Sequence, residues 1–161
     1  MSELSYDRMS PEFALVQALS TVPVIADPAG GEPKVGALQT KKDWKPPFVF
    51  YIPFEDAEDE ALDGSTGLQR FAATLHCVAG THRGLQLLCQ RCKKALKDMR
   101  GAVYSTPEHD RDEGPKGTVL IEDVTLEQSS PDLLEMEVGY YRRMYTVRLD
   151  YQTEEVRENE D

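Results

Sequence analysis

Residues Phe48–Met99 form the longest block of the chain whose residue types agree with one another, and they constrain the fold most. Phe48–Ile52 is aromatic or β-branched at every position, which is typical of a strand covered on both faces. Asp63-Gly64 indicates a hairpin turn, because glycine tolerates a positive φ and aspartate can bond its own backbone. Leu68–Val78 then alternates apolar and polar residues, which predicts a second, half-buried strand.

The residues after this strand predict an amphipathic helix from Thr81 to about Met99. Thr81 can cap the first turn through its hydroxyl, and Gly101 suits a left-handed stop. Apolar residues recur at helical spacing on one face, at Leu85, Leu88, Cys92, Leu96 and Met99. We expect this helix to lie across the apolar face of the hairpin.

The remaining elements are a short helix and further strands. Ser10-Pro11 is a typical helix start, and we predict a helix over Pro11–Leu19. Thr118–Glu127, Leu133–Val138 and Arg142–Gln152 have strand character. The predicted fold class is therefore α+β, with a mostly antiparallel sheet, one long amphipathic helix packed across it and a short N-terminal helix.

Length and pattern predict three regions. Residues 1–9 are expected to be a flexible arm, residues 10–152 a single domain, and residues 153–161 a disordered acidic tail. The acidic run Glu55–Glu60 reads as a solvated connection, because as a cation loop it lacks the glycine turn of an EF-hand.

Charge and cysteine usage exclude several classes of partner. The formal net charge is −11 and the pI about 4.7, which makes naked nucleic acid or an anionic membrane a poor partner. No apolar run approaches the length of a membrane span. Three cysteines are a poor disulfide framework and indicate a reducing compartment. We therefore expect a protein that folds in a cytoplasm.

The pair Cys89 and Cys92 forms a CxxC that has three interpretations. A zinc site would need further ligands, for which only Cys77, His76 and His82 are available. A redox pair would lie at the N-terminus of a helix, whereas this one lies two turns in. Packing of small apolar side chains in the core explains the pair most simply. We expect no catalytic residue, no cofactor and no metal.

Tyr140, Tyr141, Arg142, Arg143 and Tyr145 form a cluster of residue types that are enriched at protein interfaces. A strand with aromatic cross-strand partners would contain the same residues. Both interpretations stay open on the sequence.

The run Leu62–Arg70, followed by an alternating strand and an amphipathic helix, resembles the tail-completion (tail terminator) proteins of long-tailed bacteriophages and prophages. In that family a short helix and a proline-led aromatic strand precede an LDGxTGL-like hairpin, and an aromatic alternating strand comes last, here Tyr145–Tyr151. The similarity covers residues 10–152, and Leu62–Arg70 is its most specific part. The chain departs from the family in its acidic loop before the hairpin and in a longer segment over Thr106–Lys116.

The resemblance implies a structural virion protein that works by binding, without a chemical step. It would cap the head-proximal end of the tail tube as a ring, commonly a hexamer, and present a surface for head–tail joining. The implied partners are copies of itself, the tail tube protein and a head-side connector or stopper protein. It would be found at the tail–neck junction of the virion, and in the host cytoplasm during assembly.

The interface candidates are the hairpin turn Asp63-Gly64 and the cluster Tyr140, Tyr141, Arg142, Arg143 and Tyr145. Two alternatives remain. One is another neck component, such as a head-completion or stopper protein. The other is a small cytoplasmic metal-binding domain or enzyme that would use His76, His82, Cys89 and Cys92.

Overall fold

The computed structural model of the protein describes residues 11–23, 25, 34–37, 45–61, 64–105 and 116–156. Two helices and seven strands lie in this part of the chain. In chain order they are α1 (Pro11–Ser20), β1 (Val35–Ala37), β2 (Phe48–Ala61), β3 (Gly64–Ala79), α2 (His82–Lys97), β4 (Val103–Ser105), β5 (Lys116–Gln128), β6 (Leu133–Glu135) and β7 (Tyr140–Val156).

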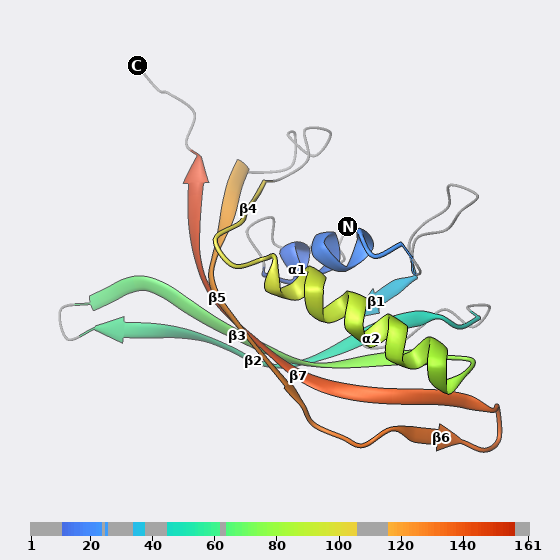
Figure 1. Ribbon diagram of the computed structural model, residues 1–161. Helices are drawn as coiled ribbons and strands as arrows, with labels where there is room; N and C mark the ends of the chain where they lie inside the picture. Colours follow the sequence, from blue (N-terminus) through green and yellow to red (C-terminus); the bar gives the residue numbers. More distant parts are fainter. Residues whose placement is uncertain are drawn as a thin grey trace, which may run out of the picture.

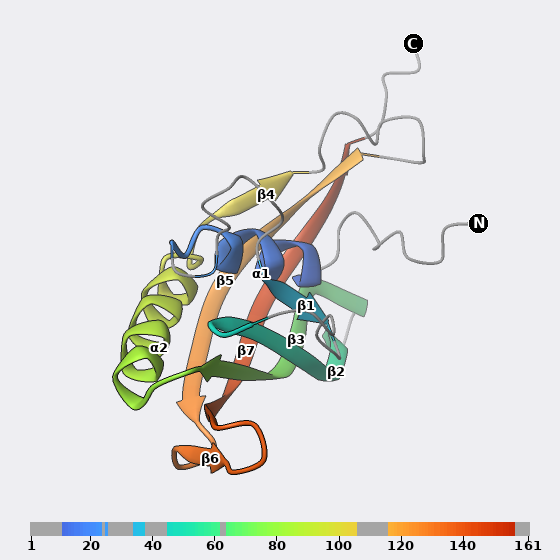
Figure 2. The same ribbon diagram turned by 90° about the vertical axis from the view of Figure 1, so that its right-hand side faces the viewer.

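These strands form one sheet with β3 and β7 at its centre. The strand order is β1-β2-β3-β7-β5-β4, and β6 pairs with the start of β7. β1 runs parallel to β2, whereas the other pairings are antiparallel. The sheet twists strongly, so the β2–β3 and β5–β7 pairs extend in different directions (Figure 1). Both helices lie on one side of it (Figure 2).

Alternate residues of β3 and β7 form the apolar face that the helices cover. The pairs Phe71–Leu149, Ala73–Val147 and Leu75–Tyr145 lie opposite each other, and all six side chains are buried. Because side chains alternate between the two faces of a strand, every second side chain of β3 and of β7 points towards the helices. The predicted apolar faces of both strands are confirmed.

Helix α2 begins with the predicted cap. The Thr81 hydroxyl oxygen accepts a hydrogen bond from the backbone N–H of Gly84 at 2.9 Å, which satisfies a free donor of the first turn. Its buried residues are Leu85, Leu88, Cys89, Cys92 and Leu96. The helix ends at Lys97 with Asp98 as a right-handed C-cap, so the predicted stop at Gly101 lies three residues beyond the actual cap. Gly101 has a φ of 79°, and its N–H donates to the carbonyl of Ile121 in β5 at 2.7 Å.

Helix α1 belongs to the same core. Its buried residues include Ala14, Leu15, Ala18 and Leu19. The hydroxyl of Tyr51 in β2 donates a hydrogen bond to a carboxylate oxygen of Glu12 at 2.9 Å, which ties α1 to the sheet. The predicted helix over Pro11–Leu19 is confirmed and ends one residue later.

The predicted fold class is wrong in its balance of elements. The chain is dominated by strands: β2, β3, β5 and β7 are 14, 16, 13 and 17 residues long. The sheet is mixed because of the parallel β1–β2 pair, and it curls, with two helices of 10 and 16 residues against it. The single long helix expected across an antiparallel sheet is not what organises the fold, although α+β remains broadly consistent.

The underestimate of strand content has a physical cause. We expected the acidic run after Phe54 to be a loop, yet β2 continues to Ala61 and pairs with β3 back to Gly64. Backbone hydrogen bonds hold such a pair whatever its side-chain pattern, and a pattern search finds only strands with an apolar face. β7 likewise reaches Val156, four residues into the predicted tail.

The division into arm, domain and tail stays a prediction. Residues 1–10 and 157–161 lie outside the described residues. Neither described helix has the length and apolar character needed to cross a membrane.

Two adjacent leucines of α2 test its orientation. Leu88 is 1% exposed and Leu87 is 41% exposed. Leu88→Asp should lower the free energy of unfolding by about 4 kcal/mol or leave the protein insoluble, because it buries an unpaired charge. Leu87→Asp is the matched control and should melt within a few degrees of the wild type. A normally melting Leu88→Asp protein, measured by circular dichroism, would contradict this orientation.

Candidate assembly interface

The predicted cluster Tyr140–Tyr145 occupies the first part of β7, between two other strands. Tyr141 lies opposite Ala79 of β3 and also opposite Leu134 of β6, while Tyr140 lies opposite Glu135. The cluster is therefore inside the sheet rather than along one of its edges.

Strand alternation divides the cluster between the two faces of the sheet. On the helix side, the ring of Tyr141 lies 5.9 Å from that of His82, the first residue of α2. Tyr145 is buried on the same side, and the ammonium of Lys93 lies 5.7 Å from the centre of its ring. On the opposite side Arg142 pairs with Glu135 at 2.9 Å. The five residues do not form one patch.

Arg143 is the centre of a polar network beneath the N-terminus of α2. Its guanidinium donates to both carboxylate oxygens of Asp132, at 2.5 and 2.9 Å, and to the Tyr145 hydroxyl at 3.1 Å. Asp132 also lies 2.8 Å from the ring Nε2 of His82. A bidentate arginine–carboxylate pair fixes the relative orientation of the two side chains in addition to neutralising their charges. The network joins β7, the segment before β6 and the start of α2.

The network changes the pKa values of the side chains that form it. The hydrogen bonds from Arg143 lower the pKa of Asp132 to about 2 from 3.8. The same bonds raise the pKa of Arg143 above its ordinary value. Burial raises the pKa of Tyr145 to about 12. The ion pair is therefore fully formed at neutral pH.

The side chain of Arg143 is only 15% exposed. Arg143 is therefore engaged inside the molecule, by Asp132 and Tyr145. The nomination of the five residues as an interface stays a prediction, and reversing the charge at Arg143 would damage folding first.

The two predicted interface sites are not brought together. Asp63 lies outside the described residues, and Gly64 begins β3. Tyr141 pairs with Ala79, at the other end of that strand. The 16 residues of β3 separate the two sites by roughly 50 Å at the usual rise of a strand. One partner subunit would contact both only across the length of the sheet.

The most exposed apolar group in the described part of the chain is one that the residue pattern did not predict. Leu134, Met136 and Val138 are 46%, 81% and 56% exposed at the turn between β6 and β7. The sequence predicts a strand over Leu133–Val138, but β6 ends at Glu135. The chain then reverses direction, with Gly139 at a φ of 72°, and the three apolar side chains are exposed to solvent. We call residues Leu133–Gly139 the hairpin tip.

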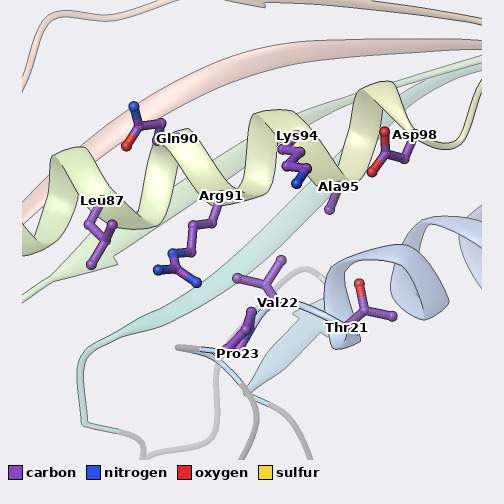
Figure 3. Close-up of a pocket in the computed structure, with 9 residues that line it drawn as sticks. All are labelled: Thr21, Val22, Pro23, Leu87, Gln90, Arg91, Lys94, Ala95 and Asp98. Carbon is purple, nitrogen blue, oxygen red and sulfur yellow. The ribbon is translucent and has the colours of Figure 1, made fainter.

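A groove of about 680 Å³ lies between α2 and the residues that follow α1. Leu87, Arg91, Lys94 and Ala95 line it from α2, together with Gln90, and Asp98 lies at one end. Thr21, Val22 and Pro23 form the opposite wall (Figure 3). We call this the α1–α2 groove.

The cysteines lie in the core as free thiols. Cys77 of β3 and Cys89 and Cys92 of α2 are all buried. The hydrogen bond with Cys77 lowers the pKa of Cys89 to about 7, and the hydrogen bonds with Cys89 and Cys92 raise that of Cys77. The three thiols thus form a small polar contact inside an apolar core.

The residues named for the alternative metal site are dispersed. His76 neighbours Cys77 in β3 and therefore faces the other side of the sheet, where it stacks on Phe50 at 4.4 Å. Burial lowers its pKa, and the charge of Arg142 lowers it further. His82 is engaged by Asp132. Among the described residues, no three His, Cys, Asp or Glu side chains are grouped as metal ligands.

Comparison with known proteins finds a likeness in fold alone. No family model and no curated protein matches the sequence. A solved chain from the virion of a native gene transfer agent (GTA) particle matches with a TM-score of 0.52 and 13% identity, over 92% of this chain and 99% of its own length. A second solved chain has a TM-score of 0.44 and 14% identity, over 93% and 99%. At these identities the first match establishes a similar architecture across nearly the whole chain.

The Asp132–Arg143 pair gives a prediction with a defined pH dependence. Because folding lowers the pKa of Asp132 from 3.8 to about 2, its ionised form stabilises the folded protein above about pH 4, and this contribution is lost as the pH falls towards 2. Asp132→Asn should lower the free energy of unfolding by about 2 kcal/mol at neutral pH.

Urea unfolding of both proteins at a series of pH values measures the effect. The difference between them should be constant at neutral pH and shrink below about pH 4. A difference that stays constant down to the acid end of the series would show that the charge of Asp132 does not stabilise the fold.

Proposed function

We propose that the protein is a structural component of a phage-like virion and acts as its tail terminator. It would cap the head-proximal end of the tail tube as a ring, commonly a hexamer, end tail elongation and provide a surface for head–tail joining. The observation that carries the proposal is the similarity of fold to a chain from a gene transfer agent virion, over 92% of this chain and 99% of that one. The family-like run Leu62–Arg70 supports the same assignment from the sequence.

The proposed activity is binding, without a chemical step. A protein that ends a tube has to contact the last subunits of the tube and present no surface that accepts another of them. Segments that extend beyond a rigid core suit such contacts. The β2–β3 end and the β6–β7 end both project from the sheet (Figure 1). The two helices cover one face of the sheet, and their buried side chains share a single core with the strands.

The proposed partners follow from this position. Copies of the protein would contact one another head to tail, because a ring is built from heterologous contacts that close by rotation. The tail tube protein would bind one face of the ring and a head-side connector or stopper protein the other. The site in the virion is the tail–neck junction, and assembly takes place in the host cytoplasm.

Deletion of the protein from the phage or prophage that encodes it tests the function. We expect tails of abnormal length, or finished heads and tails that fail to join, when particles are counted by electron microscopy. Supplying the wild-type protein in trans is the control and should restore virions. Normal virions in normal numbers without the protein would exclude this role.

The same particles distinguish the terminator from another neck component. Tails of normal length beside heads that lose their DNA would assign the protein to the head side. Purified protein added to isolated tail tubes should appear in negative stain as extra density at one end of each tube. Bare ends at saturating protein would contradict the proposal.

A further inference from the structure

The hairpin tip combines apolar and acidic side chains at the outer end of the molecule. Met136 is its most exposed apolar residue, with Leu134 and Val138 beside it. Large exposed apolar groups that gather in one place mark interaction surfaces. Glu137 is also exposed, and none of the described residues forms an ion pair with it. The tip thus offers apolar contact area with one uncompensated negative charge.

The tip is held rigidly by the sheet behind it. The backbone N–H groups of Val138 and Gly139 both donate to the carbonyl of Glu135, at 3.2 and 2.7 Å. The Glu135 carboxylate pairs with Arg142, and the Asp132–Arg143 pair fixes the chain before β6. A preformed binding segment loses little conformational entropy when it binds. This rigidity suits a permanent contact.

The α1–α2 groove has the complementary character. Leu87 and Pro23 supply exposed apolar lining, and buried Val22 lies beneath them. Arg91 and Lys94 supply two positive charges, and Asp98 at one end supplies one negative charge. Helix α2 contains several cations and no acidic residue, in a chain whose net charge is −11. In the described part of the chain, neither Arg91 nor Lys94 forms an ion pair. The volume of about 680 Å³ is sufficient for several side chains.

Tip and groove lie at different places on the molecule. Both views place the β6–β7 end away from α1, whose following residues form one wall of the groove (Figures 1 and 2). Two complementary surfaces that are separated on one chain make head-to-tail contacts between copies, and such contacts close into a ring when the rotation permits.

We infer that the hairpin tip of one copy binds the α1–α2 groove of the next. Met136 enters between Leu87 and Pro23, and Glu137 pairs with Arg91 or Lys94. Methionine adapts well to such a site, because its side chain is unbranched and flexible. The existence of a ring rests on the proposed function. The inference adds which two surfaces meet when the ring closes.

The experiment measures oligomer mass by light scattering and native mass spectrometry, in solution and after binding to tail tubes. Met136→Ser and Lys94→Glu should each weaken association at least tenfold, and Glu137→Lys should do the same. The double variant Glu137→Lys, Lys94→Glu should recover association, because the charges are exchanged rather than removed. Raising the salt concentration should weaken the wild-type oligomer.

Matched controls come from the same chain. Val103→Ser removes an apolar side chain that is 59% exposed on β4, away from the tip, and should leave the oligomer unchanged. Lys97→Glu reverses an exposed cation of α2 that does not line the groove. Melting curves should match the wild type for all of these variants, since each changed side chain is exposed.

Mixing two defective variants tests the head-to-tail geometry directly. A Met136→Ser copy retains its groove and a Lys94→Glu copy retains its tip, so an equimolar mixture should form dimers but no closed ring. Rings from the mixture, or no association at all, would overturn the assigned contact.

Other outcomes separate this contact from the proposed function. Tip variants that form normal rings but fail to cap tubes would assign the tip to the tube protein and overturn the inference. A wild-type protein that stays monomeric both in solution and on tubes would overturn it too, as would loss of association only on deletion of the acidic residues 157–161. Rings that depend on tip and groove but never bind a tube would sustain the contact and overturn the terminator function.

Discussion

Antiparallel pairing between β3 and β7 is the contact on which the rest of the structure depends. It places Phe71, Ala73 and Leu75 opposite Leu149, Val147 and Tyr145, and so creates a continuous apolar face from strands that are far apart in the sequence. Helix α2 packs on that face, and α1 packs against α2 and β1. β2 and β5 extend the sheet from its two sides. A one-residue slip in this register would turn the whole set of buried side chains towards solvent. The alternation in both strands therefore specifies the pairing.

The Asp132–Arg143 ion pair connects this core to the surface at which assembly is proposed. Arg143 reaches Tyr145 on one side and Asp132 on the other, and Asp132 reaches His82 at the start of α2. The hairpin tip begins at Leu133, directly after Asp132, and Met136 lies four residues beyond Asp132. A mostly buried arginine, chosen from the sequence as an interface residue, thus positions the proposed interface instead. The apolar and acidic side chains of the tip are exposed, and the proposal is that a second copy covers them.

The proposed role in assembly draws on three features of the architecture. Long strand pairs project from a core that two helices cover, and a chain from a gene transfer agent virion has a similar fold over nearly its whole length. The buried cysteines and dispersed histidines are accounted for by packing, stacking and hydrogen bonding. Tip and groove give each copy two complementary surfaces, which is the requirement for a ring of identical subunits.

The sequence by itself determined the helix starts, the buried faces of the two central strands and the buried cysteines, because those features depend on local capping and on periodicity along one segment. It did not determine the lengths of the strands. β2 extends to Ala61 and β7 to Val156 through backbone pairing, which leaves no mark on residue type. Nor could it place Asp132 beside Arg143, because that follows from the pairing of β6 with β7. The exposed tip and the groove were decided by tertiary structure alone, since exposure of an apolar residue depends on where the sheet ends and what packs beside it.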